Sequence, residues 1–298
     1  MTGEVRGGLP SALPHPLTGQ RFVSPVPPGT GWPEDPLARG AVAPAAGDGR
    51  EVVTLAGQAA DVQELSASVS VCRACPRLVD WRESVAVERR RAYAAEPYWG
   101  RPITGWGSSN PRVLIVGLAP AAHGGNRTGR IFTGDRSGDW LFASLHRVGL
   151  ASQPTSVHAG DGQRLIDTRM VAAVRCAPPA NKPTLGERDT CAPWLDAELR
   201  LVLPSLAAVV CLGMFAWEVT LRALARQGLA APRPRPRFGH GAEVLLERAD
   251  LERSPDKTAA SAQVAVLASF HPSQQNTFTG KLTEPMLDAV LARAASLR

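Results

Sequence analysis

Residues 113–135 read Val113-Leu-Ile-Val-Gly-Leu-Ala-Pro-Ala-Ala-His-Gly-Gly-Asn-Arg-Thr-Gly-Arg-Ile-Phe-Thr-Gly-Asp135. The first four residues are apolar and predict a fully buried strand. The small residues that follow, 117–122, predict a loop in which the backbone can approach a ligand closely. Because ligands of open α/β sheets bind at the carboxyl ends of the strands, this loop is the first place where we expect a site.

The glycines of this loop match neither of two common nucleotide-binding motifs. No Gly-Lys-Ser or Gly-Lys-Thr follows them, so the sequence excludes a phosphate-binding Walker loop. Their spacing does not fit Gly-x-Gly-x-x-Gly either. We therefore expect no dinucleotide cofactor.

Apolar runs at 113–116, 169–176, 206–212 and 264–269 predict four strands. Helical patterns lie between and around them, at 54–70, 76–91, from 137, at 184–199, 214–227 and 282–297. The helix at 184–199 opens on Thr184-Leu-Gly-Glu187, the pattern of a capping box. Strands that alternate with helices predict a central, mostly parallel four-stranded sheet covered by helices on both faces. Residues 1–50 are rich in Pro, Gly and Ala, which predicts a disordered or loosely attached extension.

Composition narrows the class of protein. The chain has 298 residues, of which 44% are hydrophobic and 20% charged, which is typical of a soluble globular protein. No segment reaches the roughly 18 apolar residues of a membrane span, and the N-terminus lacks an apolar signal core, so a cytoplasmic location is expected. The net charge of +6 suits a polyanionic partner. Nearly all of the basic residues are arginine, a preference that an Arg- and Ala-rich genomic bias explains at least as well as affinity for DNA.

The chain has five cysteines, and a reducing compartment disfavours structural disulfides. Cys211 lies inside an apolar run and is expected to be a buried hydrophobic residue. A structural zinc site usually has two close-spaced pairs, whereas only Cys72 and Cys75 are close-spaced here. Cys176 and Cys191 come from separate segments, which favours a four-cysteine [4Fe–4S] cluster over zinc and leaves unliganded cysteines open.

Three segments together resemble the uracil-DNA glycosylases of family 5 (type b). They are Gly117 to Asp135 as quoted above, Arg175-Cys-Ala-Pro-Pro-Ala-Asn-Lys-Pro183 with Cys191, and His271-Pro-Ser-Gln-Gln-Asn-Thr-Phe-Thr-Gly-Lys-Leu-Thr283. With Cys72 and Cys75 the resemblance covers about residues 70–298. It implies a three-layer α/β/α sandwich, a single catalytic domain over 51–298, and a [4Fe–4S] cluster on Cys72, Cys75, Cys176 and Cys191.

Cleavage of an N-glycosidic bond builds positive charge on the sugar and negative charge on the departing base. The transition state therefore needs a carboxylate on one side and hydrogen-bond donors on the other. Other glycosylase families carry Asp, Asn or Glu near the start of the first loop, where this chain has Leu118 and Ala119. We therefore assign the carboxylate role to Asp135, whose alternative role is to cap the following helix.

Two further residues are assigned to catalysis. His271 follows the fourth predicted strand, where a neutral imidazole can donate a hydrogen bond to the O2 oxyanion of the leaving base. The resemblance implies that Asn181 positions the water or the base, while its alternative role is to satisfy the backbone of a turn.

The expected base pocket includes the ring of Phe132, which would stack on a base flipped out of the duplex or, alternatively, pack in the core. Its other members are Gly117, Ala119, Pro120, His123 and Asn126. Expected DNA contacts are Arg130, Ser273, Gln274 and Lys281, with a solvated face as the alternative for the basic residues. Related families place an asparagine where this chain has Ala172 or Ala173, and its loss predicts a broad range of substrates.

The sequence therefore predicts a monomeric, monofunctional DNA glycosylase of base excision repair, active near the nucleoid. It would release uracil and other deaminated or damaged bases and leave an abasic site. No lysine stands in a motif as a Schiff-base nucleophile, so strand cleavage is not expected. The alternatives are a non-catalytic iron–sulfur DNA-binding protein on the same scaffold and a redox protein with a labile cluster.

Overall fold

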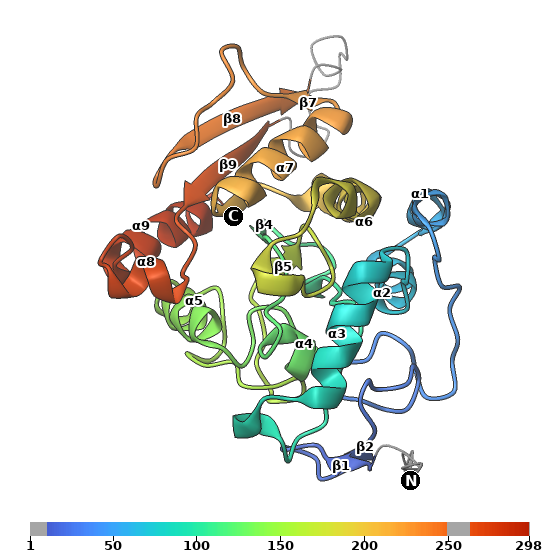
Figure 1. Ribbon diagram of the computed structural model, residues 1–298. Helices are drawn as coiled ribbons and strands as arrows, with labels where there is room; N and C mark the ends of the chain where they lie inside the picture. Colours follow the sequence, from blue (N-terminus) through green and yellow to red (C-terminus); the bar gives the residue numbers. More distant parts are fainter. Residues whose placement is uncertain (1–10, 249–262, 298) are drawn as a thin grey trace, which may run out of the picture.

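The computed structural model describes residues 11–248 and 263–297 (Figure 1). Its central sheet has seven strands in the order β3-β5-β4-β6-β9-β8-β7. The four adjacent strands at its centre run parallel to one another and match the four predicted ones. They are β4 (Val113–Gly117), β5 (Thr168–Ala172), β6 (Ala208–Leu212) and β9 (Gln263–Ser269).

The predicted strand count of four was too low, because three antiparallel strands extend the sheet. These are β3 (Trp106–Gly107) at one edge, and β8 (Glu243–Arg248) and β7 (Leu229–Ala230) at the other. Strands of two residues are too short to show any periodicity. In β8, Val244 and Leu246 are buried while Leu245 is exposed, so this strand is covered on one face only.

Helices cover both faces of the sheet, which confirms the α/β/α sandwich. On one face, α5 (Arg136–Arg147) and α9 (Glu284–Ala295) share a core with Ile115 of β4. On the other face, α6 (Leu185–Val202) and α7 (Met214–Arg226) share a core with Leu114. Consecutive residues of one strand therefore point into different cores, and both are fully buried. The capping box of α6 is present as predicted, since Thr184 accepts from the Glu187 N–H and Glu187 accepts from the Thr184 N–H.

A further group of helices lies outside α6. The pattern at 54–70 predicted one helix, but the chain forms two, α1 (Gly49–Gln58) and α2 (Val62–Ser70), and both pack against α6. Asp61 separates them, because its side chain accepts from the N–H groups of Gln63 and Glu64 and so starts a new helix. Next come α3 (Pro76–Glu88), the 3₁₀ turn η1 (Arg91–Tyr93) and the short helix α4 (Gly125–Thr128). The remaining elements are η2 (Pro179–Asn181), η3 (Leu203–Ser205) and α8 (Gln274–Phe278).

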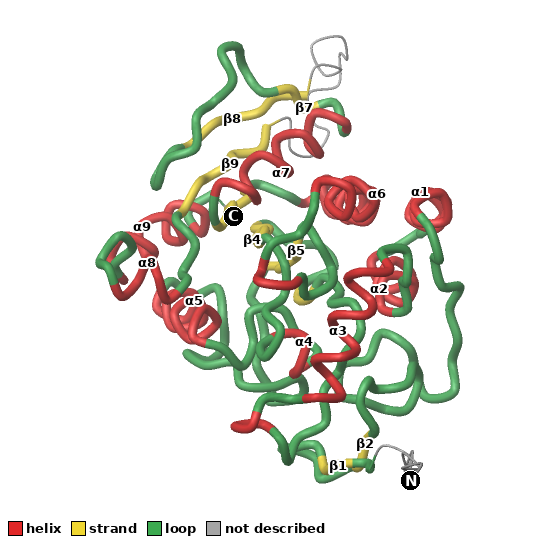
Figure 2. Tube along the Cα trace, in the orientation of Figure 1, coloured by secondary structure: helices red, strands yellow, loops and turns green. Residues whose placement is uncertain are grey.

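Residues 11–48 are not loosely attached, in contrast to the prediction from composition. Apart from the paired strands β1 (Leu13–Pro14) and β2 (Arg21–Phe22), they form a continuous loop (Figure 2). Phe22, Val26 and Trp32 are nevertheless buried in the core that includes α5. Isolated apolar residues in a Pro- and Gly-rich chain show no periodicity, so the pattern did not reveal their burial. The part of this prediction that concerns residues 1–10 lies outside the described residues.

None of the helices in residues 11–248 and 263–297 is both long enough and apolar enough to cross a membrane.

Candidate active site and cysteine site

Three loops that follow parallel strands meet around one cavity of about 490 Å³. The loop after β4 contributes His123 and Asp135, and the turn after β5 contributes Asn181. The segment after β9 contributes Ser273 and Gln274. Because the carboxyl ends of parallel strands meet at one edge of a sheet, five predicted site residues from distant parts of the sequence share this cavity.

Asp135 fulfils the capping role through one of its two carboxylate oxygens. It is the N-cap of α5, and its Oδ1 accepts from the Gly138 N–H at 2.9 Å. The other oxygen, Oδ2, lies so close to Gly124 that a Cβ there would come within 2.0 Å of it. Burial raises the pKa of the Asp135 carboxyl, and hydrogen bonds from the backbone of Gly138 and Ser137 oppose the rise. A partly buried carboxylate whose pKa is raised in this way is suited to take a proton from water.

His271 and Phe132 form a ring pair near the sheet edge, with centroids 6.0 Å apart. Burial lowers the pKa of His271 to about 4, so its imidazole is neutral at pH 7 and has one N–H to donate. Phe132 is buried and has a φ of 50°. Its ring lies against Gly117, where a Cβ would meet Phe132 Cζ at 2.6 Å. Glycine at position 117 therefore makes room for this ring.

His123 is held in place by a buried tyrosine. Tyr98 Oη accepts from the Arg90 N–H at 3.3 Å and lies 3.2 Å from His123 Nδ1. Burial lowers the pKa of His123, and the charges of Arg90 and Arg127 lower it further. The imidazole therefore enters the cavity in its neutral form.

Of the six residues assigned to the base pocket, His123 lines this cavity and the other five do not. Gly117 and Phe132 lie beside each other at the ring pair with His271, which does not line the cavity either. Asn126 is buried, and its Nδ2 donates to the backbone carbonyl of Arg82 in α3 at 3.1 Å. Pro120 is also buried, and Ala119 packs against a small core formed by Leu78, Val174 and Cys176. The side chains of Asn126, Pro120 and Ala119 therefore pack against the rest of the protein and support the loop.

The assignment of Arg130 to DNA contact was wrong. Its side chain is buried and forms ion pairs with Glu34 at 2.5 Å and with Asp161 at 2.8 Å, while its guanidinium stacks on Trp106. With two carboxylates as partners, this charge is neutralised inside the protein. Lys281, by contrast, is exposed, and its Nζ lies 4.8 Å from the centroid of the Phe270 ring.

Two arginines that line the cavity, Arg90 and Arg136, were not among the predicted site residues. Both side chains are exposed, and Arg136 lies 5.5 Å from the ring centroid of Phe278, which is 69% exposed. The run Glu88-Arg-Arg-Arg91 was a visible signal of positive charge. Only the tertiary structure brings the end of α3 back to the loop after β4.

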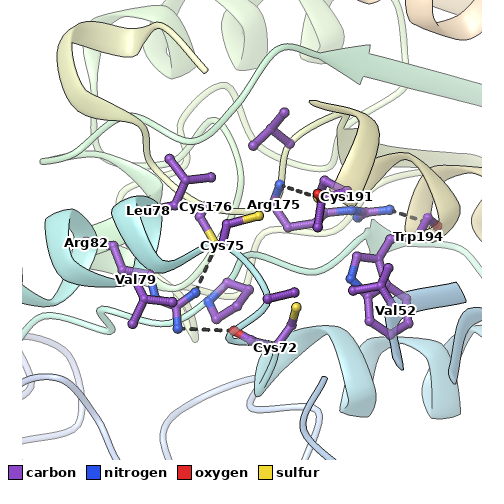
Figure 3. Close-up of a pocket in the computed structure, with 14 residues that line it drawn as sticks. Val52, Cys72, Cys75, Leu78, Val79, Arg82, Arg175, Cys176, Cys191 and Trp194 are labelled. Carbon is purple, nitrogen blue, oxygen red and sulfur yellow. Dashed lines mark hydrogen bonds between the residues drawn. The ribbon is translucent and has the colours of Figure 1, made fainter. Parts of the chain in front are cut away.

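The four cysteines that were expected to bind metal line one enclosed cavity (Figure 3). Cys72 lies between α2 and α3, and Cys75 is the N-cap of α3. Cys176 follows β5, and Cys191 lies in α6. All four are free thiols. Cys211 is buried inside β6, away from this cavity, as predicted for a hydrophobic residue.

Burial raises the pKa of the Cys75 thiol to about 12, and the neighbouring Cys176 and Cys72 raise it further. It also raises the pKa of Cys72 and Cys191. Within the described part of the chain, no three His, Cys, Asp or Glu side chains are close enough to hold a single metal ion. Four soft sulfur side chains that line one small cavity are the donor set that suits an iron–sulfur cluster.

Comparisons with known proteins agree on one family. Residues 104–295 match the model of the uracil DNA glycosylase superfamily. A type-5 uracil-DNA glycosylase of Mycobacterium bovis is 55% identical over 283 residues, which cover 95% of this chain and 98% of that protein. The type-5 uracil-DNA glycosylase of Thermus thermophilus is 46% identical over 77% of this chain and 95% of its own. That of Pyrobaculum aerophilum is 45% identical over 76% and 88%.

Proposed function

Because the chain belongs to the uracil DNA glycosylase superfamily, and within it to the type-5 enzymes, we propose that it hydrolyses the N-glycosidic bond of uracil in DNA. It is a DNA glycosylase of DNA repair and leaves an abasic site. The observation that supports this most directly is the partly buried carboxylate of Asp135, whose pKa is raised by desolvation, in the cavity that also holds Asn181 and Ser273 at the carboxyl edge of the sheet.

The reaction divides between two sides of the flipped nucleotide. Asp135 Oδ2 takes a proton from the attacking water and stabilises the positive charge on the sugar. The neutral imidazole of His271 donates its N–H to the uracil O2 as negative charge develops there. Phe132 stacks on the base, and Asn181 orients the water or the base. Among the described residues that line the cavity there is no lysine to act as a Schiff-base nucleophile, so we propose hydrolysis without strand cleavage.

Three sides of the cavity carry side chains that are suited to contact the DNA backbone. Arg90 approaches from the end of α3, and Arg136 from the start of α5. Ser273 and Gln274 lie on a third side, with Lys281 exposed a few residues further on. Exposed basic groups beside a site suit contacts with phosphates. The exposed ring of Phe278 suits stacking on a base step next to the extruded nucleotide.

We further propose a range of substrates broader than uracil. Ala172 ends β5 beside Gly117, its partner in β4, and Ala173 follows it. Both side chains are buried methyl groups. Without an amide at either of these two positions, the site has one fewer group that penalises a base with different edge groups. Hypoxanthine and hydroxymethyluracil are therefore expected substrates.

The cysteine cavity is proposed to hold a [4Fe–4S] cluster on Cys72, Cys75, Cys176 and Cys191. The supporting observations are four free thiols from three segments, two of them buried and two partly exposed, and the Arg82 guanidinium beside Cys176. Such a cluster would tie the start of α3 to the segment after β5 and to α6, and it would supply no chemistry to base excision. We also propose that the protein acts as a monomer in the cytoplasm, near the nucleoid.

The decisive experiment is an alkaline-cleavage gel assay of the purified protein on duplexes with one uracil opposite G or A. Matched duplexes would carry hypoxanthine or hydroxymethyluracil. We expect several of these bases to be excised, and we expect Asp135→Asn to lose excision while it retains DNA binding. Excision of uracil alone would contradict the argument from Ala172 and Ala173. DNA binding without any excision would instead support a non-catalytic iron–sulfur protein.

A further inference from the structure

Arg82 is a buried cation without a buried carboxylate. Its residue is 1% exposed, and its side chain projects from the middle of α3. Other buried arginines pair with carboxylates: Arg101 with Asp35, Arg130 with Glu34 and Asp161, and Arg169 and Arg175 with Glu198. The nearest carboxylate to Arg82 is the neighbouring Glu83, at 3.6 Å, which already pairs with Arg73. Because Glu83 is shared with Arg73 and partly exposed, it balances the buried charge of Arg82 only in part, and a second anion would stabilise this arginine.

The side chain of Arg82 faces the cysteine site instead (Figure 3). Nη1 donates to Cys176 Sγ at 2.9 Å, and Nη2 donates to the Cys72 carbonyl at 3.2 Å. One guanidinium therefore contacts two of the segments that would hold the cluster. A ligating thiolate at Cys176 would be the second anion beside the Arg82 guanidinium.

The backbone of the same residue faces the catalytic loop. The Arg82 carbonyl accepts from Asn126 Nδ2 at 3.1 Å, and Asn126 is buried in α4, between β4 and Asp135. The Gly100 N–H donates to the Asn126 carbonyl at 3.0 Å, which fixes α4 from a second side. Arg82 is thus in direct contact with the sulfur ligands on one side and with the support of the loop on the other.

We propose that Arg82 is a positioning residue that couples the cysteine site to the catalytic loop. Its guanidinium balances the negative charge of the ligating sulfurs and slows the loss of the cluster. Its carbonyl, fixed by that contact, holds Asn126 and so the loop from Gly117 to Asp135. The inference rests on the proposed cluster, and it concerns groups that do not touch the substrate.

The test compares Arg82→Met, Arg82→Lys and the matched control Arg77→Met after anaerobic reconstitution with iron and sulfide. Arg77 lies on the same helix and pairs with Glu187 at 2.8 Å, but it donates to no sulfur. The readouts are the rate at which a chelator removes the cluster, followed by visible absorption, and hydrogen exchange of residues 117–135.

We expect Arg82→Met to lose its cluster roughly 10- to 100-fold faster than the wild type, as is typical when a hydrogen-bond partner of a metal ligand is removed. Hydrogen exchange in 117–135 should be faster in this variant as well. Arg82→Lys, which keeps the charge, should fall between Arg82→Met and the wild type, and Arg77→Met should match the wild type. Asn126→Ala should speed exchange in the loop and leave cluster loss unchanged, because it leaves the guanidinium in place.

Equal rates of cluster loss in Arg82→Met and the wild type would overturn the proposal. If Arg82→Met does not fold, a rate of cluster loss in Arg82→Lys equal to that of Arg77→Met would overturn it too. Unchanged exchange in Asn126→Ala would overturn the link to the loop. A wild-type protein that binds no iron and sulfide would instead refute the cluster itself, whether or not uracil is excised.

Discussion

At the scale of single residues, the catalytic carboxylate depends on a neighbour that has no side chain. Oδ1 of Asp135 caps α5, which fixes the orientation of the carboxylate, and Oδ2 lies against Gly124. The capping and catalytic interpretations of Asp135 are therefore compatible, because they use different oxygens.

Gly124→Ala is expected to lower kcat/KM for uracil excision about 100-fold, since a displacement of about 1 Å at a catalytic group has an effect of that size. The new Cβ would lie 2.0 Å from Asp135 Oδ2 and must push the carboxylate away. DNA binding should persist. Gly57→Ala is the matched control, because its Cβ would meet nothing within 4 Å. A Gly124→Ala enzyme as active as this control would show that the position of Oδ2 does not matter.

Two buried histidines, His15 and His158, should make the free energy of unfolding depend on pH. The rings of His15 and His158 lie 4.3 Å apart, and burial lowers the pKa of His15 to about 4 and that of His158 to about 3, from 6.5. As the pH falls below 6.5, the unfolded chain takes up protons on both residues while the folded chain does not. The free energy of unfolding should therefore fall with pH from 6.5 down to about 4.

His158→Phe should make this dependence shallower by about 1.4 kcal/mol per pH unit, the contribution of one proton. Urea denaturation at several pH values between these limits measures the slope. His146→Phe, which removes an exposed imidazole from α5, serves as the control. The same slope in His158→Phe and the wild type would contradict the assignment of the effect to this pair.

At the scale of elements, the segment before α1 behaves as part of the folded body although it contains almost no regular structure. Trp32 is its centre, with ring centroids 4.7 Å from His15, 5.1 Å from Phe22 and 6.1 Å from Trp99. The segment therefore covers the core by individual aromatic contacts.

Trp32→Ala is expected to lower the free energy of unfolding by about 3–5 kcal/mol, the usual cost of removing a buried aromatic side chain. Val42→Ala, at a position in the same segment that is 92% exposed, should change it by less than about 0.5 kcal/mol. Urea denaturation followed by tryptophan fluorescence and circular dichroism gives both values. Equal stabilities of the two variants would mean that the segment contributes nothing to the core.

At the scale of the whole molecule, two sites lie on opposite ends of one helix. Helix α3 starts at Cys75, which lines the cysteine cavity, and ends shortly before Arg90, which lines the active-site cavity. The geometry of the active site therefore depends on what fixes the start of α3.

Cys176→Ser is expected to lose most of the bound iron and sulfide and to melt at a lower temperature than the wild type, because the link between α3 and the segment after β5 is broken. Cys211→Ala is the control, since this thiol is buried in β6 and contacts no other cysteine of the site. Iron and sulfide analysis with thermal unfolding distinguishes them. Equal iron content in both variants would remove Cys176 from the set of ligands.

The sequence by itself determined the layers of this fold and the residues that meet at its edge. The four central strands are continuous apolar runs, and Thr184 with Glu187 marks the start of α6, so local pattern was sufficient for both. Because ligands of open α/β sheets bind at the carboxyl ends of the strands, the loop that carries Asp135 could be assigned to a site from sequence. Asn181 and Ser273 were assigned from the family resemblance, and the structure places all three at one cavity.

Only the tertiary structure decided which charges are neutralised and which remain available. Arg130 and Arg90 look alike in the sequence, yet Arg130 pairs with Glu34, nearly a hundred positions away, while Arg90 lines the cavity. The burial of Trp32 and the contact of Arg82 with Cys176 were likewise decided only by the tertiary structure. Ion pairing and burial depend on partners that are distant in the chain, and periodicity and local motifs report only on neighbours.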